Sequence, residues 1–201
     1  PLSMRLEVEL DGVWTDITPD VLSSPEPRMS GMGINGNGLK DRVGDNAVLT
    51  FSLDNSIGNS AGTQGYYTPY GASVRTGFNF PKGLHIHVYF EWNYIRRYKF
   101  YGIVETWKVM AGKYKERRVD VKCQNWMKAA ANHQLNLLGY QLNKRFDEGI
   151  RLILDNMARQ PQNINFRNGE ETFPTLFDIT RTNTKALGEI NKLTMSEFGR
   201  T

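Results

Sequence analysis

Apolar and polar residues alternate with a period of two in four separate stretches of the chain. The apolar side of these stretches consists of Leu6, Val8 and Leu10; Ala47, Leu49, Phe51 and Leu53; Leu84, Ile86, Val88 and Phe90; and Val119, Val121 and Cys123. This period is typical of β-strands that bury one face and expose the other. Gly- and Pro-containing turns separate the stretches, so we predict an antiparallel β-barrel or sandwich over residues 4–124.

Turn residues support this interpretation near the amino terminus. Asp11-Gly12 lies between two strand-like runs, and both residues tolerate the positive φ that a tight hairpin turn requires. Further strands are expected at residues 73–78, 97–108 and 117–122. Residues 29–44 are rich in Gly and are typical of a long loop or a poorly specified strand.

The pattern changes to a helical period after residue 124. Residues 125–138 favour a short helix, and Asp147 is expected to cap a helix over 148–159. The apolar stripe of that helix consists of Ile150, Ile153, Leu154 and Met157. A last helix is expected after Thr184. We therefore predict a smaller α+β domain over residues 125–201, which continues beyond the last residue.

The charge pattern and the cysteine content argue against a dedicated nucleic-acid binder and a disulfide-stabilised protein. The net charge of +4 comes from 25 basic and 21 acidic residues that are mixed along the chain. A dedicated nucleic-acid binder more often shows a clustered basic patch. The single cysteine, Cys123, excludes an intrachain disulfide. No apolar stretch approaches the ~18 residues of a membrane-spanning helix, so stable membrane insertion is not expected.

The histidines and the cysteine are the candidates for a metal site or a catalytic site. His85 and His87 share one face of a predicted strand, as two metal ligands could, but no third ligand has a suitable spacing. The alternative is an outward polar strand face. Cys123 could act as a nucleophile with His133, but its place in the alternation predicts a buried small apolar residue. We therefore predict no catalytic residue, no metal ligand and no cofactor.

The segment 31–36 matches the G-x-G-x-x-G pattern of dinucleotide-binding loops. That pattern functions between a strand and a helix, where backbone N–H groups meet the pyrophosphate. The Pro-rich segment before it does not resemble a strand, and the residues after it do not begin a helix. We interpret the match as chance in a Gly-rich segment.

Basic and aromatic residues are interleaved at 94–101, in the run YIRRYKFY. On a barrel strand, such residues can stack bases and bind phosphates, so an oligonucleotide-binding β-barrel module is the alternative function. A period of two places Tyr98 and Phe100 on one side and Arg97, Lys99 and Tyr101 on the other. That is also the pattern of a barrel strand with one solvent-exposed face.

The order of several short motifs resembles the tail hub or tail-tip structural proteins of long-tailed bacteriophages. These motifs are LDGVWTDIT at 10–18, AVLTFSLDN at 47–55, YTP at 67–69, GASVR at 71–75, FYGIV at 100–104, VDVKCQN at 119–125, KAL at 185–187 and SEFG at 196–199. The resemblance covers most of the chain. It implies a tail-tube-like β-barrel that helps to build a ring continuing the tail tube toward the tip or baseplate hub.

The same resemblance implies partners and a location. We expect a non-enzymatic virion component, assembled in the host cytoplasm as a homotrimer at the tail tip. Its partners would be a distal tail or tube protein and a tape measure protein, with DNA only as passing cargo.

The segment after Leu53 then becomes a candidate subunit interface. It is rich in Gly and Ser and ends in Tyr66, Tyr67 and Tyr70. With so few apolar residues, the loop is expected not to pack on itself, and tyrosine is enriched at interfaces. We predict that a neighbouring subunit orders it. Lys113 and Tyr114, in the turn of a long hairpin, are further candidate interface residues.

Overall fold

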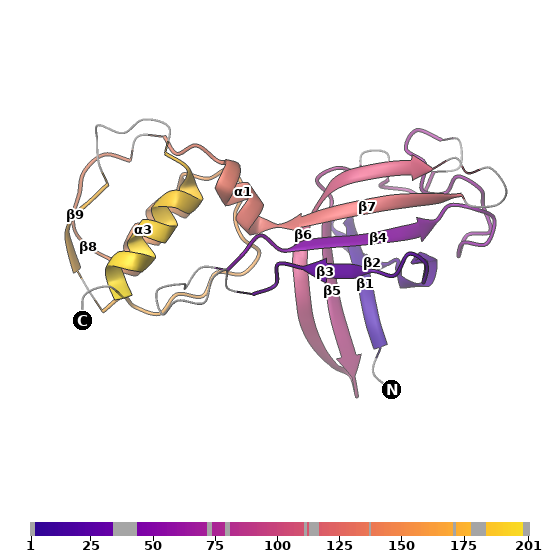
Figure 1. Ribbon diagram of the computed structural model, residues 1–201, viewed down its shortest axis with the longest axis horizontal. Coiled ribbons are helices and arrows are strands. Elements are labelled where there is room, and N and C mark those ends of the chain that lie inside the picture. Colours follow the sequence, from indigo (N-terminus) through magenta and orange to yellow (C-terminus); the bar gives the residue numbers. More distant parts are fainter. Residues whose placement is uncertain are drawn as a thin grey trace. The chain divides into compact units, whose positions relative to one another are not determined.

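The computed structural model describes residues 3–33, 44–71, 74–78, 81–110, 112, 117–136, 138–170, 172–177 and 184–198. The described residues divide into two compact units (Figure 1). One unit comprises those within Pro1–Ser30 and Ala47–Asn125, and the other those within Gly31–Asn46 and Trp126–Thr201. Predominant antiparallel strands and a smaller helical part agree with the expected fold class.

The first unit is one antiparallel sheet with the strand order β2-β1-β5-β6-β7-β4-β3. Its elements are β1 (Ser3–Leu10), β2 (Val13–Asp16), the 3-10 helix η1 (Thr18–Asp20), β3 (Arg28–Ser30), β4 (Val48–Asp54), β5 (His85–Trp92), β6 (Ile95–Met110) and β7 (Arg118–Asn125). Asp11 and Gly12 have φ values of 50° and 81°, which confirms the predicted hairpin between β1 and β2.

The segment after β2 closes this sheet into a barrel-like shape. The Ile17 N–H donates to the Leu6 carbonyl (3.0 Å), and the Leu6 N–H donates to Thr18 Oγ1 (2.8 Å). Four residues later, the Leu22 N–H donates to the Ser52 carbonyl of β4 (2.8 Å). Because three strands separate β1 from β4 in the sheet order, one short segment can reach both only if the sheet curls.

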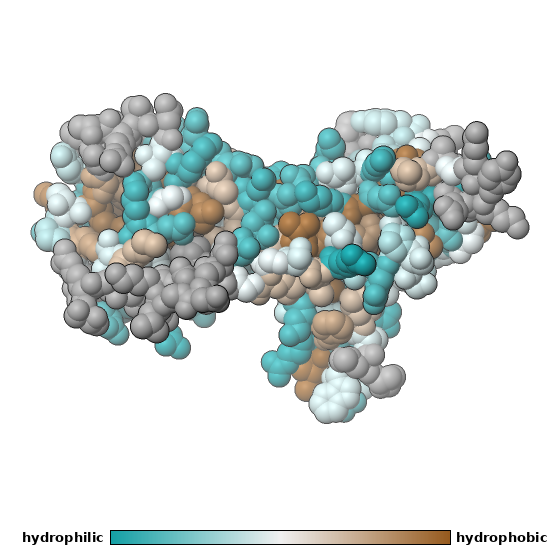
Figure 2. All heavy atoms as spheres, viewed as in Figure 1, coloured by the Kyte–Doolittle hydropathy of each residue, from teal (hydrophilic) through white to brown (hydrophobic). Residues whose placement is uncertain are grey.

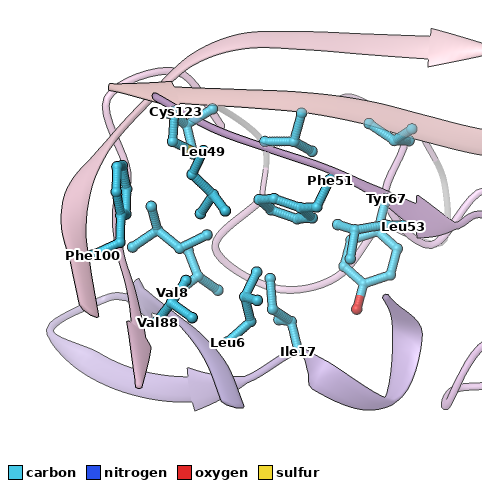
Figure 3. Packing of buried hydrophobic residues seen from close by; sticks show 14 of the residues in the cluster. Leu6, Val8, Ile17, Leu49, Phe51, Leu53, Tyr67, Val88, Phe100 and Cys123 are labelled. Atoms are coloured by element: carbon cyan, nitrogen blue, oxygen red, sulfur yellow. The ribbon is translucent and has the colours of Figure 1, made fainter. Parts of the chain in front are cut away.

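Side chains from both halves of the curled sheet fill its interior (Figure 3). The predicted core residues are each at most 3% exposed, namely Leu49, Phe51, Ile86, Val88 and Val121. Cys123 is also buried, as its place in the alternation predicted. Burial raises the pKa of its thiol far above the usual value, which disfavours the thiolate that nucleophilic chemistry needs.

A β-bulge overturns the predicted faces of β6. Val88 pairs with Phe100, and Tyr89 pairs with Tyr98, so Lys99 is the extra residue between them. Phe100 therefore enters the core, whereas the Tyr98 ring lies beside that of Tyr89 at a centroid distance of 5.4 Å. The expectation that Tyr98 and Phe100 share a side is wrong because one inserted residue reverses the alternation.

Two further strand predictions differ from the structure. Residues 28–30 form β3, which pairs with β4, so a short strand does precede Gly31; residues 34–43 of the G-x-G-x-x-G region lie outside the described part. In the predicted strand 73–78, the described residues 74–78 form a turn rather than a strand. The Phe78 N–H donates to the Arg75 carbonyl (3.0 Å) within that turn.

The second unit packs three helices with a two-stranded antiparallel sheet. Its elements are α1 (Trp126–Asn132), β8 (Gln141–Arg145), α2 (Phe146–Asp155), β9 (Thr172–Leu176) and α3 (Ala186–Phe198). The predicted stripe of Ile150, Ile153, Leu154 and Met157 is buried, as expected, but α2 ends at Asp155 rather than at 159, so Met157 follows the helix. The described residues among 31–46, which the sequence grouped with the strands, cluster with this unit.

Asp147 does not cap α2, contrary to the prediction. The helix begins at Phe146, two residues before the predicted start, and Asp147 lies in its first turn. There it accepts hydrogen bonds from Arg145 and from the Gly169 N–H (2.9 Å). These bonds hold the pKa of its carboxyl below the usual value. The Glu148 carboxylate caps the helix start instead, by accepting the Arg145 N–H (2.8 Å).

Candidate subunit interface

The loop that follows β4 is organised by two asparagine side chains. Asn55 Oδ1 accepts the Tyr67 N–H (2.8 Å), and its Nδ2 donates to Thr68 Oγ1 (2.8 Å). Asn59 bonds both backbone groups of Thr63, at 3.2 Å and 2.8 Å. The expectation that this loop cannot pack on itself is wrong, because side-chain amides replace the missing apolar contacts.

Asp20 of η1 joins this loop to the barrel. Its carboxylate is buried and accepts the Ser60 N–H (2.6 Å), the Ser60 hydroxyl (2.7 Å) and the Tyr67 hydroxyl. Arg75 Nη1 donates to the Tyr67 oxygen (2.8 Å) and lies 3.9 Å from Asp20. Burial and the bond to Asp20 raise the pKa of Tyr67 far above its usual value. The phenol therefore stays protonated and donates to the buried carboxylate, in addition to the two bonds from Ser60.

Tyr67 cannot offer its side chain to a neighbouring subunit. The residue is 0% exposed and belongs to the barrel core (Figure 3). Its ring contacts Phe78 at a centroid distance of 5.3 Å, and its carbonyl accepts the Trp107 indole N–H (3.1 Å). Sequence inspection placed it on the surface because its strongest partner, Asp20, lies 47 residues away.

Tyr66 and Tyr70 lie at the surface of the same loop. Tyr66 is partly buried, and the Arg75 guanidinium lies over its ring at 5.5 Å. Tyr70 is 71% exposed and has a φ of 61°. Of the other candidate interface residues, Lys113 and Tyr114 lie outside the described residues.

The histidines of β5 lie on the sheet face opposite the core. His87 stacks on Trp14 of β2 with centroids 3.8 Å apart, and its Nε2 lies 2.7 Å from Glu7 Oε2. The Tyr89 hydroxyl donates to the other oxygen of Glu7 (2.7 Å). His87 is only 4% exposed, so the expected solvent-facing histidine is wrong: Trp14 covers it. Within the described residues, no cluster of His, Cys, Asp or Glu suits a metal ion.

His133, the other residue weighed as a catalytic partner, also has a structural contact. Its Nε2 lies 3.1 Å from the Asn156 carbonyl, which makes the ring a tie between two segments of the second unit. Cys123 in the first unit and His133 in the second therefore each have a structural environment of their own.

The end of the β5–β6 hairpin exposes several large apolar side chains among the described residues of the first unit. We call Trp92–Tyr101 the hairpin arm. Trp92 is 57% exposed, Tyr94 is 97% exposed and Tyr98 is 58% exposed. In Figure 1, β5 and β6 extend past the other strands, and in Figure 2 this extension forms a projection from the unit. Among the described strands, only β5 pairs with Ile95–Tyr101, since β7 begins pairing at Gly102.

Sequence inspection missed this arm as a surface feature. The run was interpreted as a strand with one exposed side, although Ile95–Lys99 is exposed on both sides. The sequence did contain a signal of this exposure. The five residues Ile95–Lys99, which follow Asn93-Tyr94, lack the alternation of apolar and polar residues that marks the core strands.

The fold of this chain, a curled antiparallel sheet and an α+β unit, is similar to that of a solved phage tail protein. The expected resemblance to tail proteins is confirmed at the level of the fold. The crystal structure of the 43 kDa tail protein of prophage MuSo2 from Shewanella oneidensis aligns with a TM-score of 0.51 and 9% sequence identity. The alignment covers 96% of this chain and 48% of that one, so the chain spans about half the length of that tail protein.

Two other solved structures are less similar. A tail protein from Neisseria meningitidis MC58 aligns with a TM-score of 0.48 and 8% identity, over 94% of this chain and 44% of that one. An E. coli type VI secretion component, described as structurally similar to the T4 tail proteins gp27 and gp5, aligns at 0.41 and 10% identity, over 96% and 39%. No family model and no curated protein matches the sequence. Among the described helices, none is long and apolar enough to cross a membrane.

Proposed function

We propose that this chain is a structural component of a bacteriophage tail, located at the tail tip or baseplate hub of the virion. The observation that carries the proposal is the match of the whole chain, both units included, to the fold of a phage tail protein. Of the sequence motifs that resemble tail hub proteins, those at 10–18, 47–55, 100–104 and 119–125 lie mainly in strands, and the described residues of those at 185–187 and 196–199 lie at the two ends of α3. The chain acts by assembly, without an enzymatic step, a cofactor or a metal.

In the tail, several copies would form a ring that continues the tail tube. The interior of this barrel is filled by its own side chains, so a single copy cannot enclose a passage for DNA. A closed ring requires heterologous contacts, in which one surface of each copy meets a different surface of the next. We propose a homotrimer with a distal tail or tube protein above it and the tape measure protein and DNA inside.

The surface tyrosines of the loop after β4 are candidate contacts with these partners. Tyr70 presents a large amphipathic ring to solvent, and the Asn55 network holds the nearby backbone in one conformation. A side chain held in advance loses less entropy on binding. Tyr66 and Tyr70 therefore stay in the proposed interface, together with Lys113 and Tyr114, and Tyr67 supports the loop from the interior.

Class averages of the intact phage particle test this function. A fusion of the chain to a small globular tag should add density at the tail tip, repeated with the symmetry of the ring. A particle that carries the tag along the tube or in the capsid would contradict the tip location. A particle that lacks the chain altogether would contradict the tail function.

An oligonucleotide-binding module remains the second candidate, because the hairpin arm exposes aromatic and basic side chains together. Tyr94, Tyr98 and Lys99 are all exposed on it. A binder of this kind should bind short single strands with an affinity that falls steeply as salt rises. A tail component should show no such affinity.

A further inference from the structure

We propose that the hairpin arm of one copy pairs, edge to edge, with β2 of a second copy. This inference rests on the proposed tail function and identifies the surfaces that would meet in the ring. The arm supplies an exposed strand edge over Ile95–Tyr101, and β2 supplies another over Val13–Asp16. Both edges belong to the same chain, so a heterologous contact between copies can repeat around a ring.

The first observation is a strand edge that no described strand pairs. Within the described residues, Ile95–Tyr101 bonds only to β5, although β6 continues as a central strand from Gly102 onward. β2 is the terminal strand of the sheet and pairs only with β1. Exposed edges present rows of N–H and C=O groups that favour pairing with another strand.

The second observation is charge. The arm carries Arg96, Arg97 and Lys99 and no acidic residue from Trp92 to Tyr101. Two arm edges would therefore repel one another, which is a common protection of exposed strands. The basic arm would instead attract an acidic strand edge, because partners with complementary charge are favoured over partners of like charge.

The β1–β2 region is the acidic counterpart. Residues 6–27 contain six acidic residues and no Lys or Arg. Asp20 is buried and Glu7 is bonded to His87 and Tyr89, which leaves Glu9, Asp11, Asp16 and Glu26 for the surface. Asp11 and Asp16 lie exposed at the two ends of β2, and Arg5 pairs with Asp16 at 3.1 Å. The opposite sheet edge, β3, begins with Arg28 and would repel the arm. Charge therefore favours β2 over β3 as the strand that meets the arm.

The third observation is apolar matching and rigidity. Val13 of β2 is 64% exposed, and Ile95 of the arm is 51% exposed. The arm is also braced: the Arg96 guanidinium lies 4.8 Å from the centre of the Tyr89 ring, and the Tyr98 ring contacts that of His87 at 5.1 Å. A strand that its own contacts already hold in place loses little conformational entropy when a partner strand pairs with it.

Crosslinking distinguishes a heterologous contact from a symmetric one. One variant carries Ile95→Cys and another carries Val13→Cys; the native Cys123 is buried and serves as background. A short bismaleimide should link the two variants when they are mixed and should link neither variant to itself. Dimers of Ile95→Cys alone would show an arm-to-arm contact and overturn the proposal, as would a mixture without dimers.

Charge reversal then tests the complementarity. Arg97→Glu with Lys99→Glu should lower the yield of the mixed dimer roughly tenfold, and Asp11→Lys with Asp16→Lys in the other variant should restore it. Lys82→Glu with Lys108→Glu is the matched control, since it changes the net charge equally at exposed positions outside the arm. An equal loss in the control, or no restoration, would overturn the proposal.

Two further results separate this proposal from the tail function. A chain that is found as a ring at the tail tip but fails to crosslink would refute the arm–β2 pairing and leave the function standing. A chain that crosslinks as expected but is absent from the particle would refute the function alone. Salt-dependent binding of oligothymidine that competes with the crosslink would assign the arm to nucleic acid and overturn the pairing.

Discussion

The loop after β4 and the hairpin arm reverse the roles that their sequences indicate. Residues 55–71 are rich in Gly, Ser and Asn, as mobile loops are, yet the structure fixes them through Asn55, Asn59 and the buried Asp20. The arm has the composition of an ordinary strand, yet its segment Ile95–Lys99 is exposed on both faces. Local composition does not decide exposure in either case. The loop is fixed by a partner far away in the sequence, Asp20. The arm is exposed because it extends past β7, the strand that would otherwise pair with its free edge.

The largest expected effect concerns the buried tyrosine of the loop. Tyr67→Ala should lower the free energy of unfolding by about 3–5 kcal/mol, as Phe51→Ala should, because both side chains are buried in one core. Tyr70→Ala, three residues away but exposed, should change it by less than about 0.5 kcal/mol. Urea unfolding of the three variants measures this difference. Equal effects of Tyr67→Ala and Tyr70→Ala would show that the loop is not part of the core.

The next effect concerns the carboxylate that anchors the loop. Asp20→Asn should cost about 2–3 kcal/mol, since the amide presents a donor where Ser60 and Tyr67 already donate. Asp16→Asn is the control, because its carboxylate is exposed and pairs only with exposed groups. If urea unfolding shows no change in the free energy of unfolding for Asp20→Asn, the loop does not depend on the Asp20 carboxylate.

Hydrogen exchange compares the two regions within one sample. The N–H groups of Gly65 and Tyr67, bonded to Asn55, should exchange slowly in the isolated chain. Those on the unpaired edge of Ile95–Tyr101 should exchange fast and become protected only in the assembly. Slow exchange of the arm in the isolated chain would show that its edge is already covered.

The sequence predicted the interior of the barrel well and its surface poorly, for a physical reason. Alternation reports which side chains avoid water, so Phe51 and Val121 were placed correctly. It does not report a bulge, and one extra residue at Lys99 reversed the faces of Tyr98 and Phe100. It also cannot report a polar bond across 47 residues, which is why the buried Tyr67 was expected at the surface.

The smallest expected effect lies at the tip of the arm, where Asn93 and Tyr94 form the turn with φ values of 47° and 64°. Asn tolerates this conformation, but a tyrosine there is strained, because its Cβ approaches the following carbonyl oxygen. Tyr94→Gly creates the Asn-Gly pair that such turns favour and should raise the free energy of unfolding by about 0.5–1 kcal/mol.

The same change removes a ring that is 97% exposed and available to a partner. We therefore expect Tyr94→Gly to melt slightly higher than the parent chain and to enter phage particles less well. Asp11→Gly, at the turn between β1 and β2, is the control for the melting temperature alone, because Asp11 belongs to the proposed β2 edge and its loss affects incorporation too. Particles that incorporate Tyr94→Gly as well as the parent would show that the arm reaches no partner through its tip.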